Sequence, residues 1–316
     1  MREGNDLVGW GMASGIWEAM QLKASARAVL TANGSVEIAS ATADIGPGTY
    51  TMMAQIGAEL LGVPLESVTV KLGDSSLPDA PVEGGSFTTS SVGSAIHGAC
   101  RAVQKELLQL AQKAAESPLA GAKLGDVLFA DGKIRHNRDP KRQVSLADAM
   151  RAGRADRIEK EATAEPDEGS KYSHYTHSAV FAEVRVDAEL GVIRVARVVS
   201  AVAAGRILNP KVAGSQILGA VVGGIGMALH EETSTDHRFG RFMNHSLAEY
   251  HVPVNADIHA IDVIFVEEED DEINPLGVKG VGEIGIVGTA AAIANAVYHA
   301  TGKRVRDLPI TLDKLM

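Results

Sequence analysis

Cysteine is nearly absent from this sequence, which contains a single residue of that type, Cys100, among 316. One thiol cannot form an internal disulfide, and it cannot supply a four-cysteine zinc or iron–sulfur site. Cys100 lies in an alanine-rich helical stretch, where a lone cysteine is typical of a small buried apolar residue. Aromatic residues are also scarce, at 4%. The chain therefore offers little surface for stacking nucleic-acid bases.

The sequence contains fewer basic than acidic residues, with 30 Lys and Arg against 40 Asp and Glu, which gives a net charge of −10. This balance argues against a nucleic-acid partner. We find no apolar run of membrane-span length, and the N-terminal string MREGNDLVGWGMA has no signal-peptide core. The sequence therefore predicts a soluble protein without a membrane span. The immediate start on a strand-like pattern suggests that more chain normally precedes residue 1.

Glycine is abundant, with 33 residues, and it recurs at the turns between alternating strand-like and helical segments. Hairpins are predicted around Asn33-Gly34 and Leu190-Gly191. Each half of the chain reads hairpin, glycine loop, helix, strand, glycine loop, helix. The pattern predicts an α+β fold made of two related subdomains, with helices packed on mixed sheets. We expect Thr49 to cap the helix ending near Leu61, and a later helix to begin near Ser94.

A charged stretch separates the two predicted subdomains. Residues 152–169 are rich in Arg, Glu and Asp, which is typical of a solvated linker. We therefore divide the chain into a first subdomain at 1–150, a linker at 151–177 and a second subdomain at 178–316. A long helix is predicted from about Lys211 to Glu231 in the second subdomain.

The second subdomain ends in a loop that holds one ionisable side chain among glycines. Residues 271–295 read DEINPLGVKGVGEIGIVGTAAAIAN, with Glu283 deep in the loop and a smooth helix after Gly288. Glycines allow close backbone approach, and a helix N-terminus offers unpaired N–H groups to an anion. This loop could present one carboxylate beside an anionic cofactor, although glutamates in such loops are more often simply solvated.

The same loop contains Gly280, Gly282 and Gly285 in the spacing of a dinucleotide-binding fingerprint. That fingerprint requires a hydrophobic strand just before it and an acidic residue about twenty positions later. Here INPLGVK precedes the motif and the chain ends soon after it with LPITLDKLM, so the βαβ setting of the fingerprint is lacking. A nicotinamide-dependent dehydrogenase is therefore only an alternative reading. Protein ligands for a metal are not predicted, because His230 lacks the second histidine of a zinc motif and the acidic run at 267–272 is typical of a solvated loop.

Three further glycine-rich loops precede predicted helices, namely DIGPGT at 44–49, GGSFTTSS at 84–91 and the segment ending in NPKVAGSQILGA at 209–220. Each by itself is typical of a structural cap. Taken together, the four loops could bind one large anionic ligand.

The string VKGVGEIGIVGTAAAIANAV resembles the C-terminal signature of the xanthine oxidase family of molybdenum hydroxylases. The resemblance covers the chain from about Gly9 to Pro309, and RDLPIT near the end is similar to the bacterial aldehyde oxidoreductases of this family. It implies that Glu283 is the catalytic base and that the cofactor is molybdopterin, with the cytosine dinucleotide form as one option. It also implies oxidation of aldehydes or N-heterocycles with water as the oxygen source.

The resemblance implies that residues of the glycine loops contact the cofactor. Ile45, Gly46 and Pro47 match the first cofactor loop, where proline stands in place of the family's glutamine and cannot reproduce its hydrogen bond. The second loop matches at Gly85, Ser86 and Thr88. The remaining implied contacts are Gln216, near the metal and pterin, and Gly282.

Family large subunits are about twice this long, so the resemblance implies that this chain is the C-terminal part of one, as an excised piece or a split subunit. The implied partners are the missing N-terminal half, iron–sulfur and FAD subunits and a small substrate.

We expect the isolated chain to lack cofactor and activity. We expect the protein to reside in a bacterial cytoplasm or periplasm. A non-catalytic cofactor-binding or assembly module is a further alternative.

Overall fold

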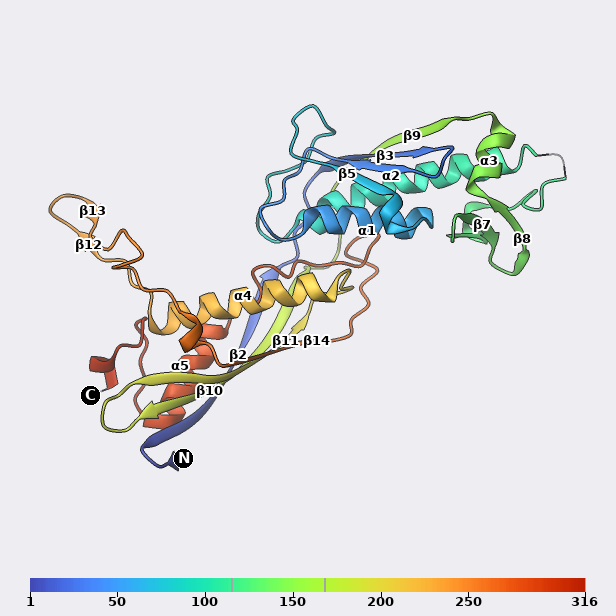
Figure 1. Cartoon of the computed structure of the whole chain (residues 1–316). Helices are drawn as coiled ribbons and strands as arrows, with labels where there is room; N and C mark the ends of the chain where they lie inside the picture. Colours follow the sequence, from blue (N-terminus) through green and yellow to red (C-terminus); the bar gives the residue numbers. More distant parts are fainter. Residues whose placement is uncertain (115, 168, 316) are drawn as a thin grey trace. The chain divides into compact units, whose positions relative to one another are not determined.

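The computed structural model describes residues 1–114, 116–167 and 169–315. Its internal contacts divide the chain into two compact units (Figure 1). Unit 1 comprises Met1–Ala19, His174–Glu269 and Gly280–Met316. Unit 2 comprises Met20–Ser173 and Asp270–Lys279.

Unit 1 is built on a five-stranded sheet in the order β1-β2-β10-β11-β14. All neighbours are antiparallel except β11 and β14, which run parallel. The helices α4 and α5 pack on this sheet, and a small hairpin of β12 and β13 follows α4. The elements are β1 (Arg2–Glu3), β2 (Asp6–Glu18), β10 (Tyr175–Asp187), β11 (Ile193–Ala203), α4 (Pro210–Leu229), β12 (Thr235–Asp236), β13 (Arg241–Phe242), η3 (Asn255–Asp257), β14 (Ala260–Phe265), α5 (Thr289–Thr301) and η4 (Leu312–Leu315).

Unit 2 contains a four-stranded sheet in the order β5-β4-β3-β9, in which only β4 and β5 are parallel. Helices α1 and α2 pack on it, and the three strands β6, β7 and β8 form a second, smaller sheet. The elements are β3 (Ala24–Thr31), β4 (Val36–Ala39), α1 (Thr49–Leu61), η1 (Leu65–Ser67), β5 (Val68–Lys71), α2 (Thr88–Ala111), η2 (Leu124–Asp126), β6 (Val127–Ala130), β7 (Lys133–His136), β8 (Asp139–Ser145), α3 (Leu146–Gly153) and β9 (Arg157–Ala164).

The two sheets share one topology, which confirms the predicted internal repeat. The series β2, β10, β11, β14 in unit 1 corresponds to β9, β3, β4, β5 in unit 2, with the same sequence of antiparallel, antiparallel and parallel pairings. The units are not continuous in sequence, however. Strand β2 precedes all of unit 2 in the chain but pairs in unit 1, and residues Asp270–Lys279 belong to unit 2 although they lie late in the sequence. The units are therefore not the linear blocks 1–150 and 178–316.

Strand β9 lies where the sequence pattern predicted an unstructured linker. Its charged residues occupy positions where they remain near solvent, while Ile158 is fully buried. Glu159 lies within 3.7 Å of Arg27 on the neighbouring strand, and Lys160 pairs with Glu106 of α2 at 2.5 Å. An edge strand whose charged residues form ionic contacts with its neighbours reads as a solvated segment in the sequence alone.

Helix α4 corrects the expectation that no segment reaches membrane-span length. By length and mean hydropathy, 20 residues and 1.7, it could cross a bilayer. In the structure Ile217, Val221 and Ile225 are buried in the hydrophobic core of unit 1. Core helices of water-soluble folds pass the same compositional criterion, so α4 is weak evidence for a membrane.

Helix α5 lies directly against strand β2 because β2 carries glycine where the helix approaches. A Cβ atom at Gly9 or Gly11 would overlap backbone atoms of α5. Side chains of α5 also bond the open edge of β2. His299 Nδ1 accepts from the Trp10 N–H at 2.9 Å, and Asn295 Nδ2 donates to the Met12 carbonyl at 2.9 Å.

Replacing Gly11 by alanine should destabilise unit 1, because the new methyl group would overlap the Ala292 carbonyl oxygen and the Ala296 amide nitrogen. Helix α5 would have to move, and overpacking of this kind costs roughly 1–3 kcal/mol. The free energy of unfolding in urea measures the effect. Gly219→Ala is the matched control, since it lies exposed in α4 with nothing near its Cβ position. We expect it to be neutral or stabilising by up to ~1 kcal/mol. Equal stabilities of the two variants would contradict the packing argument.

Candidate functional site

The loop that carries Glu283 is fixed to unit 1 at several points. Thr176 Oγ1, which is buried, donates to the Gly280 carbonyl at 2.9 Å. Ile284 is fully buried in the core, and Thr289 Oγ1 at the start of α5 donates to the Gly285 carbonyl at 2.8 Å. Glu283 itself is half-buried. A carboxylate is therefore held on a backbone whose neighbours are locked by packing and hydrogen bonds.

Gly285 brings this loop against helix α4. A Cβ atom there would lie 2.8 Å from Ala220 Cβ and 3.1 Å from Ile217 Cα and carbonyl oxygen. Only glycine permits that approach without displacing one of the two segments. Gln216, next to Ile217, is half-buried on the same turn of α4. The structure thus brings the segments of Glu283, Gly282 and Gln216 together within unit 1.

In unit 2 the first glycine loop is organised by Asp44. Its Oδ1 accepts from the N–H groups of Gly46 and Gly48 at 3.0 and 3.3 Å, and its Oδ2 accepts from the Tyr50 N–H at 3.2 Å. These bonds hold Ile45, Gly46 and Pro47 in a tight projecting loop. Helix α1 begins after Gly48, so the prediction that Thr49 caps it is wrong.

The second loop of unit 2 contains two successive residues in the left-handed region. Gly85 has φ 57° and Ser86 has φ 63°. For a non-glycine residue this conformation is costly and often marks a functional loop. Phe87 is buried beneath the loop, and α2 begins at Thr88, six residues before the predicted start.

Glu83 joins these two loops, and the sequence reasoning did not single it out. Its Oε1 accepts from Thr49 Oγ1 at 3.2 Å, while its Oε2 is shielded from solvent and has no hydrogen-bond partner among the described residues. Burial raises the pKa of the Glu83 carboxyl and the charge of Asp44 raises it further, against the hydrogen bond from Thr49 that lowers it. The only sequence signal was an acidic residue directly before a Gly-Gly pair.

The segment leading to the Glu283 loop is stabilised within unit 2 by a buried ion pair. Lys279 Nζ lies 2.9 Å from Asp270 Oδ2, and the Lys279 side chain is 5% exposed. Burial raises the Asp270 pKa, but the hydrogen bond and charge of Lys279 outweigh it, so the pKa lies below its ordinary value. Asn274 closes the turn between them, with its Nδ2 donating to the Val278 carbonyl at 2.7 Å.

The dinucleotide fingerprint at Gly280–Gly285 lacks its structural setting. Strand β14 ends at Phe265, and the described residues from there to Thr289 form turns and one isolated bridge. A Rossmann motif needs a strand that enters the glycine turn directly. Over the described ranges, groups of three or more side chains suited to hold a metal ion are also absent.

The glycine loops of unit 2 suit both an anionic group and an N–H donor. Helix α2 begins without a side-chain cap and without an acidic residue in the first turn, which favours an anion at its N-terminus. At α1 the two carboxylates of Asp44 and Glu83 disfavour an anion. The shielded Glu83 Oε2 instead needs a hydrogen-bond donor. In unit 1, helix α5 also begins without a side-chain cap or an acidic first turn.

These features are those of a cofactor-binding domain, and the sequence comparison agrees. The chain belongs to the family of molybdopterin cofactor-binding domains, which matches residues 1–259. It is 44% identical to the Escherichia coli K12 aldehyde oxidoreductase molybdenum-binding subunit PaoC, over 100% of this chain and 41% of that protein. It is 30% identical to the gamma subunit of the 6-hydroxypseudooxynicotine dehydrogenase complex of Paenarthrobacter nicotinovorans, over 89% and 36% of the two chains.

A solved structure shows the same fold. Quinoline 2-oxidoreductase from Pseudomonas putida 86 superposes with a TM-score of 0.87 at 23% identity, covering 98% of this chain and 41% of that chain. The α+β fold class predicted from the sequence is thus confirmed. The chain spans about two fifths of the length of the relatives it matches.

Removing the charge of Asp270 should destabilise the protein, because Asp270→Asn leaves the buried Lys279 ammonium without this carboxylate. We expect a loss of at least about 1–3 kcal/mol at pH 7. The folded pKa of Asp270 is lowered, so its contribution is complete above the unfolded pKa of about 3.9 and is lost as pH falls through the folded value. Unfolding in urea at several pH values measures this difference. Asp271→Asn, an exposed neighbour, should leave stability unchanged. A parent–variant difference that grows toward acidic pH would contradict the assignment.

Proposed function

We propose that this chain is the C-terminal, cofactor-binding part of the molybdenum-binding subunit of a molybdenum hydroxylase. The observation that carries the proposal is the single carboxylate of Glu283 on a fixed glycine loop beside the α4 turn of Gln216. The names of relatives support aldehydes or N-heterocycles as the substrate class. The net reaction on an aldehyde would be aldehyde plus water giving carboxylic acid, two protons and two electrons.

In this proposal Glu283 is the general base. Its carboxylate accepts one of the released protons at an Oε atom, and the half-buried position partly excludes bulk water from that oxygen. The bound cofactor would supply the capacity to take up the electron pair. The task of the protein is therefore to place one base and to hold the cofactor in a fixed orientation.

The other loops are proposed to hold the cofactor. We propose that this cofactor is molybdopterin in its cytosine dinucleotide form. Gly85, Ser86 and Thr88 would bind its anionic groups at the α2 N-terminus. Ile45, Gly46 and Pro47 would flank the pterin, with Glu83 Oε2 as a hydrogen-bond acceptor for a pterin N–H group. Gly282 and Gln216 would complete the contacts in unit 1.

The length of the relatives supports one proposed partner, the remaining part of the molybdenum-binding subunit. The family resemblance supports the others, iron–sulfur and FAD subunits that would carry the electrons away. Contacts from the remaining part would contribute to cofactor affinity, and each 1.4 kcal/mol of binding free energy is a factor of about ten in affinity. The isolated chain would therefore hold little molybdenum and be inactive.

Changing Glu283 to glutamine should lower turnover of the assembled enzyme by about 10²–10⁴-fold, the usual contribution of a general base. Molybdenum content should stay near that of the parent, because glutamine has nearly the same shape as glutamate. Steady-state kinetics with an aromatic aldehyde and elemental analysis measure the two quantities. Glu272→Gln, exposed on the same segment, should keep parental turnover. Near-parental turnover by a molybdenum-loaded Glu283→Gln enzyme would remove Glu283 from the catalytic role.

Changing Gln216 to alanine should instead lower cofactor retention. A lost hydrogen bond to a bound group costs roughly 1–3 kcal/mol, so molybdenum should be lost more rapidly on dialysis while the melting temperature of the protein stays unchanged. Ser215→Ala, on the adjacent exposed position of α4, is the control. Equal molybdenum loss from both variants would show that the Gln216 amide does not bind the cofactor.

A further inference from the structure

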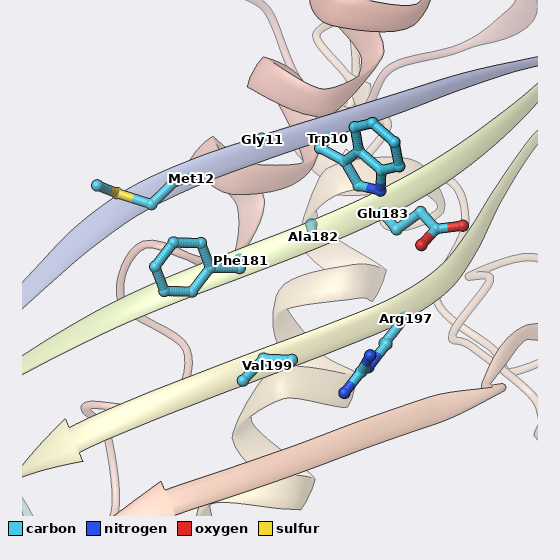
Figure 2. A pocket seen from close by; sticks show the side chains of 8 residues that line it. All are labelled: Trp10, Gly11, Met12, Phe181, Ala182, Glu183, Arg197 and Val199. Carbon is cyan, nitrogen blue, oxygen red and sulfur yellow. The ribbon is translucent and has the colours of Figure 1, made fainter. Parts of the chain in front are cut away.

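One face of the sheet in unit 1 is covered by helices and the other is not. Figure 2 shows α4 and α5 behind the strands, while Trp10, Met12 and Phe181 project from the opposite side. We call this opposite side the outer face. Its large apolar side chains are each about half exposed to solvent, and they are Trp10, Met12, Ile16, Phe181 and Ile264.

The outer face mixes large apolar side chains with polar ones. A sheet with one solvated face shows mainly polar residues at its outward positions. Here the outward positions of β2 carry Trp10, Met12 and Ile16 as well as Ser14 and Glu18. Strand β10 adds Phe181 opposite Met12, and β14 adds Ile264 opposite Ala201 of β11. Apolar surface that is contiguous over several strands marks an interaction site.

The outer face also has the anatomy of a protein interface. A shallow groove of about 380 Å³ lies among Trp10, Met12, Phe181 and Val199, with Glu183 and Arg197 at its border (Figure 2). Arg197 pairs with Asp262 at 2.7 Å on the neighbouring strand. An apolar centre rich in aromatic and methionine side chains, with charged residues at the rim, is typical of specific interfaces.

We propose that the outer face docks the part of the molybdenum-binding subunit that the longer relatives carry and this chain lacks. This inference rests on the proposed function. The relatives match all of this chain over only 41% of their length, so a large polypeptide region remains to be placed against it. A second copy of this chain is a poorer occupant, because each copy has a net charge of −10 and like charges repel.

The test uses a chimera in which this chain replaces the matched segment of PaoC, compared with this chain alone. Cysteine is introduced at Phe181 on the outer face, or at Leu190, an exposed apolar residue in the β10–β11 turn. In the chain alone the single native thiol is a silent background, since Cys100 is fully buried and burial raises its pKa to about 12. In the chimera, labelling is followed on the peptide that contains the introduced cysteine, so that thiols of the PaoC part do not contribute. Maleimide labelling rates then report the exposure of each introduced thiol.

We expect Phe181→Cys to label rapidly in the chain alone and at least about tenfold more slowly in the chimera, while Leu190→Cys labels at one rate in both. Equal labelling of position 181 in both contexts would overturn the proposal. Protection that appears in the chain alone as its concentration rises would show that a second copy covers the face, which also overturns it.

Charge substitutions give an independent readout. Phe181→Glu should lower the melting temperature of the chimera by roughly 2–4 °C or more, without changing that of the chain alone, and Leu190→Glu should change neither. An unchanged melting temperature of the Phe181→Glu chimera would refute the docking face.

The molybdenum content of the unsubstituted chimera tests the proposed function separately. A chimera without molybdenum but with position 181 protected would refute the function and leave the docking face intact.

Discussion

The close seating of helix α5 on strand β2 is the contact on which the rest of unit 1 depends. Gly9 and Gly11 remove the side chains that would separate them, and His299 and Asn295 satisfy backbone groups on the strand's open edge. The Glu283 loop runs directly into α5 through Thr289. The position of the carboxylate is therefore set by how deeply a helix sits on a glycine-bearing strand.

Much of the architecture was readable from local signals. The Asn-Gly and Leu-Gly turns predicted the hairpins, and the apolar stretch after Pro210 predicted helix α4. Strand β9 was missed because its charged residues read as a solvated linker. The pairing of β2 with β10 could not be predicted, since strand pairing between distant segments leaves no trace in local composition.

The candidate site was predictable only in part, for a similar reason. Glu283 stands out as one acidic residue among glycines, whereas Glu83 resembles any acidic residue in a polar loop. What distinguishes Glu83 is its shielded oxygen and its bond to Thr49, and both depend on tertiary packing. Thr49 does not cap α1 because the helix begins at Thr49 itself and Gly48 occupies the cap position.

The pairing of β2 with β10 ties the beginning of the sequence to a sheet formed mostly by its end. Strand β2 precedes all of unit 2 in the chain, yet it belongs to the sheet of unit 1. A break of the chain between β2 and β3 would leave unit 2 with all four strands of its larger sheet. Unit 1 would lose the strand on which α5 sits, and it could regain that contact only by binding the separated strand.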